Sequence, residues 1–270
     1  MRYVRRMFWD FHRPWLRRLI LLANCLLPVA VILSRFSNLP LLGAAIVAHA
    51  LLVFAIMHPR CPWLGPVVRG FRTDQRAVWL TIDDGPDGGQ TLRLSEELRT
   101  RGVKATFFVI GGRLVQQPEV ARALIEAGHT LANHSATHPQ ARMWRLGAAS
   151  ARVEVEGGIA ALKTAGVVSP WFRSPVGHKP PGLSAVLAAR GLRQIGWTAG
   201  GRDGHAGNIP DAVSRIQRKV RPGGILLLHE CRAHSFETII ATVDALLARG
   251  FAFVVPADDA LGEPEPAGKS

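Results

Sequence analysis

The chain has 270 residues, of which 48% are hydrophobic and 20% charged, a composition that excludes a disordered protein and allows one sizeable α/β domain or two small ones. The formal net charge is +13, but residues 1–76 hold 11 Arg, no Lys and 2 Asp, which gives +9 and leaves +4 for the other 194 residues. Because the positive charge gathers near the N-terminus and no recognition motif accompanies it, it does not indicate a nucleic-acid-binding protein. Cys25, Cys61 and Cys231 have neither the spacing of a disulfide framework nor that of a zinc finger.

Two apolar blocks without a formal charge, Leu19–Ser34 and Leu39–Met57, lie in the N-terminal segment. At about 1.5 Å per residue they give helices of about 24 and 28 Å, compared with about 30 Å for the hydrocarbon core of a membrane. We expect a two-helix membrane hairpin over about residues 19–34 and 39–57, within a basic region 1–76. A buried helical pair is the alternative. A cleaved signal peptide fits less well, because a second block follows and no clear small-residue cleavage site is present.

The arginines around these blocks predict an orientation. Six arginines precede the first block, and only Arg35 lies between the two. Positively charged flanks stay on the cytoplasmic side, so the N-terminus is expected there, and two crossings return the chain to the same side. The following domain is then expected on the cytoplasmic face; if the first block does not cross, that domain is exported to the periplasm.

Short β-type runs alternate with amphipathic helical patterns from residue 77 to residue 256. Strict alternation predicts a mainly parallel sheet, and seven strands in fewer than 200 residues favour a barrel-like closure. The polar, Pro/Gly-rich tail 257–270 is expected to be flexible. The expected strands are Ala77–Ile82, Lys104–Ile110, His129–Asn133, Val167–Phe172, Leu192–Trp197, Gly224–His229 and Phe251–Val255.

Reactive side chains follow the ends of these strands. Asp83 and Asp84 come directly after the first strand, in "TIDDGPDGGQ". In β/α barrels the loops after the carboxyl ends of the strands build the active site, so we expect one shared site. Four further residues lie at corresponding positions after later strands: His134, Arg173, Asp203 and His229.

The segment "NHSATHP" indicates a metal site. It places His134 and His138 four residues apart, and with one aspartate they form a facial set of two imidazoles and one carboxylate. The histidine pair alone is a weak signal, but the aspartate pair and the strand-end residues strengthen it. A bound metal lowers the pKa of its water from about 15.7 to about 7 and polarises a carbonyl oxygen. One aspartate can then bind the metal while the other accepts the water proton.

Three more residues fit an amide hydrolysis. The Arg173 guanidinium can keep a carboxylate base ionised. His229 can donate a proton to a leaving amine, and Asp203 can favour the protonated imidazole. Each also fits a structural role when taken alone: a helix cap or surface pair for Arg173, a core histidine for His229 and a turn residue for Asp203. Together they predict metal-assisted amide hydrolysis.

Five ordered segments, together with the strand "KATFFVIG", resemble the polysaccharide deacetylases of carbohydrate esterase family 4, which carry the nodulation-factor deacetylase homology domain. They are "TIDDGPDGGQT", "NHSATHP", "RSPVG", "WTAGGRDG" and "ILLLHE". The resemblance spans about residues 77–255 and implies a distorted seven-stranded (β/α) barrel.

The resemblance also implies a role for each site residue. The metal, usually zinc, would be bound by Asp84, His134 and His138. Asp83 would be the general base, and the other roles would fall to Arg173 holding that base, His229 as the acid, Asp203 supporting His229, and the backbone N–H of Val176 stabilising the oxyanion.

Two departures from the family pattern bear on the substrate. Val176 stands where many relatives carry an aromatic residue, and Gly204 where many carry a Trp that lines the sugar groove. Together with the hairpin and its basic flanks, this suits family members that remove an N-acetyl or N-formyl group from polyprenyl-phosphate-linked amino sugars. The expected partners are thus a glycan or glycolipid and the bacterial inner membrane, and not a nucleic acid. The alternatives are an exported deacetylase of peptidoglycan or a chitin-like polymer, and a catalytically inactive glycan-binding protein.

Overall fold

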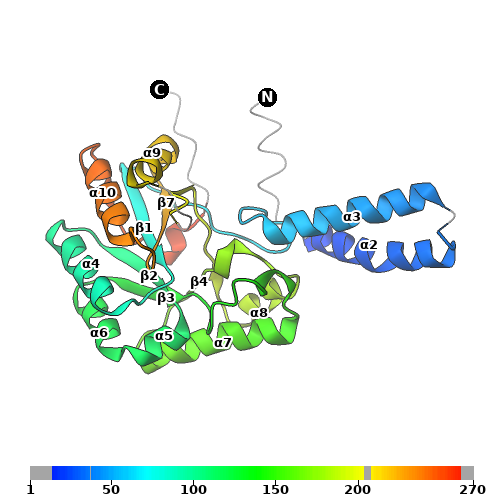
Figure 1. Ribbon diagram of the computed structural model, residues 1–270, viewed down its shortest axis with the longest axis horizontal. Coiled ribbons are helices and arrows are strands. Elements are labelled where there is room, and N and C mark those ends of the chain that lie inside the picture. Colours follow the sequence, from blue (N-terminus) through cyan, green and yellow to red (C-terminus); the bar gives the residue numbers. More distant parts are fainter. Residues whose placement is uncertain (1–13, 37, 204–207, 263–270) are drawn as a thin grey trace.

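The computed structural model describes residues 14–36, 38–203 and 208–262. Two long apolar helices project from an α/β domain (Figure 1). The arginines at positions 2, 5, 6 and 13, which support the expected orientation, and Gly204 lie outside the described residues.

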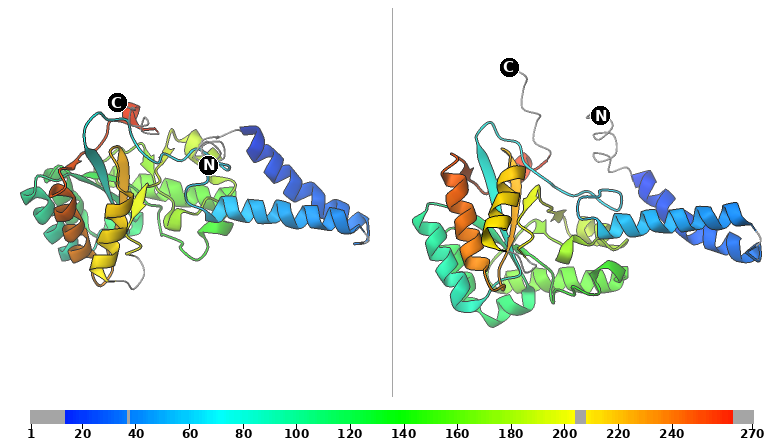
Figure 2. Two further views of the ribbon diagram at one scale, coloured as in Figure 1. Left: turned by 90° about the horizontal axis from the view of Figure 1, so that it is seen from above. Right: turned by 45° about the horizontal axis from the view of Figure 1, so that its top comes forward.

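The two helices, α2 (Pro14–Leu33) and α3 (Leu39–Met57), lie side by side (Figures 1 and 2). Inside this apolar pair the side-chain amide of Asn24 donates a hydrogen bond to the Ala48 carbonyl of the other helix at 3.0 Å. Both helices are long and apolar enough to cross a membrane, and large side chains such as Leu26 and Ile46 are exposed. This exposure does not fit a buried helical pair. By length and composition the helices can serve as a membrane anchor or a signal sequence.

A curled parallel sheet forms the centre of the domain. Its strand order is β5-β4-β3-β2-β1-β7-β6, and the short β8 pairs with the start of β1. This path of seven strands confirms the predicted distorted (β/α) barrel. The strands are β1 (Ala77–Asp83), β2 (Ala105–Val109), β3 (Thr130–Asn133), β4 (Trp171–Phe172), β5 (Arg193–Gln194), β6 (Ala199–Gly200), β7 (Gly224–His229) and β8 (Ala252–Phe253).

The expected strand over residues 192–197 is shorter than predicted, and β6 was not predicted. Strand β5 ends at Gln194, and the next two carbonyl groups do not continue a strand ladder. Instead the buried Arg173 guanidinium donates hydrogen bonds to the carbonyls of Ile195 at 3.2 Å and of Gly196 at 3.0 Å. A side chain thus takes two acceptors that a neighbouring strand would use, and beyond β5 the chain forms only an isolated bridge, between Ile195 and Val68, before the strand β6.

Helices cover the outside of the curled sheet (Figure 1). Strand β1 is buried on both faces: Val78, Leu80 and Ile82 pack with the helices, whereas Trp79 belongs to a second cluster. This alternation follows from the two-residue period of a strand. The helices are α4 (Gly88–Thr100), α5 (Gly111–Gln116), α6 (Pro118–Glu126), α7 (Ala148–Thr164), α8 (Leu183–Ala189), α9 (Ile209–Lys219) and α10 (Ser235–Leu247).

The linking segment, residues 58–76, connects α3 to β1 and is part of the domain. Val68 forms a parallel bridge with Ile195 beyond the end of β5, and Gly70 forms a bridge with Gly224 at the start of β7. The linking segment therefore runs along the edge of the sheet between β5 and β7. Further on, Phe71 pairs with Leu261, which lies within the expected flexible tail.

A buried carboxyl group supports the loop after β1. Glu230, directly after β7, is 3% exposed, and its Oε1 accepts a hydrogen bond from the Thr91 hydroxyl at 2.5 Å. Its Oε2 has no partner among the described residues and packs against Gly85, where a Cβ atom would lie only 2.0 Å away. Burial raises the pKa of Glu230 from its usual 4.5 to about 7.

We expect Glu230→Gln to remove a pH dependence of stability. Because burial favours the protonated form, the stability that this group contributes is fully present below about pH 4.5 and is lost as the pH rises through about 7. In the wild type this pKa shift corresponds to a decrease in the free energy of unfolding on the order of 3 kcal/mol. Glu230→Gln carries a neutral amide and should not show this decrease. The measurement is the free energy of unfolding at pH 5 and pH 8, with the exposed Glu126→Gln on α6 as the control. An equal loss in wild type and Glu230→Gln would contradict this assignment.

Candidate active site

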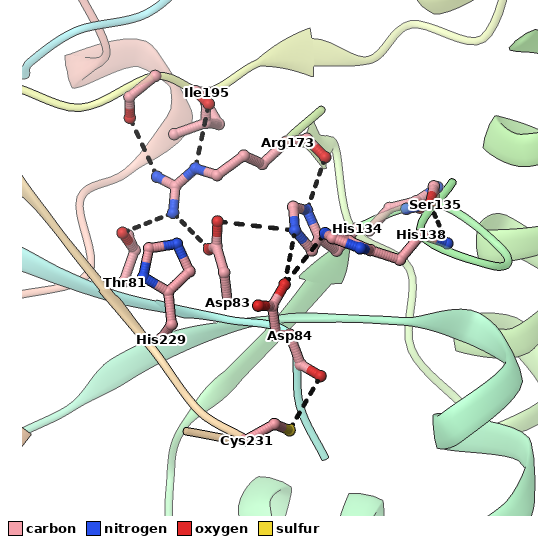
Figure 3. Close-up of polar contacts among 12 residues, drawn as sticks. Thr81, Asp83, Asp84, His134, Ser135, His138, Arg173, Ile195, His229 and Cys231 are labelled. Carbon is pink, nitrogen blue, oxygen red and sulfur yellow. Dashed lines mark hydrogen bonds and ion pairs between the residues drawn. The ribbon is translucent and has the colours of Figure 1, made fainter. Parts of the chain in front are cut away.

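The loop after β1 holds the two adjacent aspartates. Asp83 is the last residue of β1, and Asp84 has a left-handed backbone conformation with φ of 76°. Both carboxylates are buried and face His134: its Nε2 lies 3.8 Å from Asp83 Oδ2 and 3.4 Å from Asp84 Oδ1 (Figure 3). The turn at Asp84 thus lets two consecutive residues reach the same imidazole.

Asp84, His134 and His138 form a compact set of possible metal ligands, with ligand atoms all within 4.8 Å of one another. Asp84 Oδ1 lies 3.1 Å from His138 Nε2. His134 Nδ1 lies 2.9 Å from the Arg173 carbonyl, which can only accept a hydrogen bond, so the other ring nitrogen keeps a lone pair for a metal. Two imidazoles and a carboxylate are a donor set that suits a catalytic divalent ion such as zinc.

The protonation state of Asp84 also fits a cation site. Burial acts to raise the pKa of Asp84, but the adjacent imidazoles of His134 and His138 outweigh this effect and hold the pKa well below its usual range. The carboxylate is therefore anionic at physiological pH and ready to bind a positive ion.

Arg173 binds the other aspartate, Asp83, through one of its two oxygens. Its guanidinium is 1% exposed and donates hydrogen bonds of 2.7 Å to Asp83 Oδ1 and to the Thr81 hydroxyl. It also stacks on the Phe108 ring, with 4.1 Å between the guanidinium carbon and the ring centre. Because Oδ1 of Asp83 is bound to Arg173, Oδ2 is the oxygen that points toward His134.

His229, at the end of β7, is paired with Asp203. Asp203 Oδ1 lies 3.1 Å from His229 Nδ1, and Oδ2 accepts the His229 backbone N–H at 2.8 Å. Burial acts to lower the pKa of His229, but the hydrogen bond and charge of Asp203 outweigh it and raise the pKa. His229 is the register partner of Asp83 on the neighbouring strand, and its ring appears with the site residues in Figure 3. The site thus contains an imidazole suited to donate a proton.

Val176 lies on the loop after β4, three residues beyond Arg173, in the short helical turn Pro175–Gly177. Its backbone has φ of 50°, and its side chain is 39% exposed. The last residues of β1 and β7 and the loops after β1, β3, β4 and β6 therefore supply all eight residues predicted from the sequence.

The sequence analysis missed other residues that contact the site. The Thr81 hydroxyl binds Arg173, and Arg232 Nη2 lies 2.8 Å from Asp84 Oδ2. The Cys231 thiol donates a hydrogen bond to the Asp84 carbonyl at 3.4 Å. Their position in the sequence could have identified Cys231 and Arg232. Both directly follow the end of β7, and the predicted site residues also lie at or just after the ends of strands.

Comparison with known proteins agrees with this arrangement. The family profile described as polysaccharide deacetylase matches residues 71–195. The chain is 35% identical over 157 residues to the chitooligosaccharide deacetylase of a Bradyrhizobium species, covering 57% of this chain and 71% of that protein. It is 30% identical over 210 residues to the peptidoglycan-N-acetylglucosamine deacetylase of Listeria monocytogenes, covering 76% of this chain and 42% of that protein.

Solved structures give the same result. The family 4 carbohydrate esterase of Streptomyces lividans, solved in complex with acetate, is similar with a TM-score of 0.63 and 30% identity, covering 70% of this chain and 97% of that one. The fold, the ordered motifs and these relatives lead to one conclusion: the chain belongs to the polysaccharide deacetylase family, carbohydrate esterase family 4.

Proposed function

We propose that the protein is a metal-dependent hydrolase that removes an N-acetyl or N-formyl group from a lipid-linked amino-sugar glycan at the membrane. The observation that carries this proposal is the grouping of Asp84, His134 and His138 beside the Asp83–Arg173 pair. These ligands would hold a divalent ion, most simply Zn²⁺, which when bound activates a water molecule and polarises the amide carbonyl.

The two aspartates have different tasks in this mechanism. Asp84 faces the imidazoles and would hold the metal together with them. Asp83 is fixed through Oδ1 by Arg173 at 2.7 Å, so its other oxygen is available to accept a proton from the attacking water. The backbone N–H of Val176 stabilises the oxyanion.

The leaving amine receives its proton from His229, at the end of β7. Asp203 raises the pKa of His229, which favours the protonated imidazole and suits it to act as the general acid for the departing amine. Breaking the amide bond thus requires a base and an acid, which the chain supplies from the loops after β1 and β7.

The contacts of the hairpin support a substrate at the membrane surface. The loop that carries Val176 packs on the end of α3: the Lys179 backbone N–H donates to the Ile56 carbonyl at 2.9 Å, and its ammonium group donates to the His58 carbonyl at 2.5 Å. At Gly177 a Cβ atom would lie 2.7 Å from Pro59. With the hairpin in a membrane, one rim of the site lies only a few residues from the membrane-spanning helix. This favours a lipid-linked glycan as the substrate. The arginine-rich flanks of the hairpin favour the cytoplasmic face of a bacterial inner membrane.

The relatives support an alternative: an exported deacetylase of peptidoglycan or a chitin-like polymer. A reporter fused to the C-terminus that works on one side of the membrane only distinguishes these two locations. The third possibility, an inactive glycan-binding protein, is disfavoured because the metal ligands and the base are all present.

We expect Asp83→Asn and Asp84→Asn to lose deacylase activity for different reasons. Loss of the base lowers kcat by about 10²–10⁴-fold while the metal is retained. Loss of the ligand empties the metal site, as does a chelator. Metal content and amine release are measured for both variants, with the exposed Asp74→Asn as the control. Full activity of metal-free wild type would overturn the metal-dependent mechanism, and an inactive wild type would point to the glycan-binding alternative.

We expect Asp203→Asn to narrow the pH profile on its alkaline side. Asp203 raises the pKa of His229, so the neutral amide lowers that pKa and the acid loses its proton at a lower pH. The measurement is kcat against pH for both proteins. An unchanged alkaline limb would show that His229 is not the acid.

We expect more acetate or formate release from a lipid-linked amino sugar in vesicles than from a soluble oligosaccharide with the same acylated sugar. The reason is the contact between α3 and the Val176 loop. The full-length protein is tested with acetylated and formylated forms of both substrates. Equal rates would contradict the lipid-linked substrate but leave the deacylase function intact.

A further inference from the structure

Two arginines at the rim of the site have no task in the proposed mechanism. Arg232, three residues after His229, has a side chain 39% exposed, and its Nη2 donates to Asp84 Oδ2 at 2.8 Å. Arg113 lies in α5, after β2, is half-buried, and its Nη1 donates to the Cys231 thiol at 2.5 Å. Strands β2 and β7 are the two neighbours of β1 at this end of the sheet, so the arginines flank the loop that carries Asp84.

The partners of these arginines leave much of their hydrogen-bonding capacity unused. Arg113 makes no ion pair with a carboxylate in the described part of the chain, and a thiol is a weak acceptor. Arg232 has one carboxylate partner, and that carboxylate belongs to the metal-ligand set. When Asp84 shares its charge with a divalent ion, it attracts Arg232 less strongly. The rim then carries two guanidinium groups that an anion of the substrate can neutralise.

We propose that Arg113 and Arg232 form a subsite for an anionic oxygen group, a phosphate or a carboxylate, carried by the glycan substrate. This inference rests on the proposed deacylase function and extends it to the substrate class: the preferred substrate is an acidic amino-sugar glycan. A guanidinium matches either group, because its parallel N–H donors bind two oxygens at once. A neutral chitin-like sugar would occupy the catalytic centre without using this subsite.

Turnover of three soluble oligosaccharides with the same N-acyl sugar tests the proposal: one neutral, one with a phosphate ester and one with a carboxylate. The proteins are full-length wild type, Arg113→Gln, Arg232→Gln and, as the control, Arg99→Gln on the exposed face of α4. We expect the wild type to prefer an acidic substrate in kcat/KM. Each rim variant should lower the acidic-to-neutral ratio about tenfold, mainly through KM. The control should leave the ratio unchanged. Whichever acidic substrate shows the larger effect identifies the anion as phosphate or carboxylate.

Metal content is measured for every variant, because Arg232 touches a metal ligand. If Arg232→Gln loses metal and turns over neutral and acidic substrates equally poorly, Arg232 positions Asp84, and the anion subsite is overturned. An acidic-to-neutral ratio that stays the same in both rim variants overturns it as well.

Binding of the deacylated acidic sugars by calorimetry separates this proposal from the proposed function. If the wild type deacylates the neutral substrate but binds acidic and neutral products equally, only the anion subsite fails. In the opposite case the wild type turns over no substrate but binds the acidic products more tightly than the neutral one, and the rim variants bind both equally. The anion subsite is then supported and the deacylase function fails.

Discussion

The hydrogen bonds of one buried guanidinium hold the active site together. Arg173 reaches Asp83 and Thr81 on β1, and the carbonyls of Ile195 and Gly196 after β5. A buried charge is stabilised only when its donors are satisfied and an opposite charge is near, and here both conditions are met. The same ion therefore orients the Asp83 carboxylate and joins β1 to the segment that follows β5. Removing either member of the Arg173–Asp83 pair would leave an uncompensated charge in the core.

The division of labour between the two aspartates follows from this arrangement. Neighbouring carboxylates in a uniform environment would be chemically equivalent, but Asp83 is paired with an arginine and Asp84 with two imidazoles. The left-handed backbone at Asp84 makes this possible, because a regular strand would send consecutive side chains to opposite faces. Local backbone geometry thus turns a repeated residue into two chemically distinct groups.

The sequence was sufficient to predict the parts of the structure that depend on local patterns. Alternating apolar runs gave the parallel sheet, and the position of reactive residues after the strands predicted their convergence. The short β6, the support of Gly85 by Glu230 and the contact of Arg232 with Asp84 join residues far apart in the chain. No local period encodes such contacts. The expected strand over residues 192–197 shows the same limit, since it is interrupted by a side chain that arrives from β4.

The linking segment between α3 and β1 has a mechanical consequence. A flexible tether would let an anchored domain sample a hemisphere above the membrane, but residues 58–76 are fastened to Ile195, Gly224 and Leu261 along their course. With α2 and α3 inserted in a membrane, these contacts hold the domain at one height and tilt above the bilayer. For the proposed lipid-linked substrate, enzyme and substrate then meet by lateral diffusion in one plane, so the surface density of the substrate, and not its bulk concentration, sets how often the two meet.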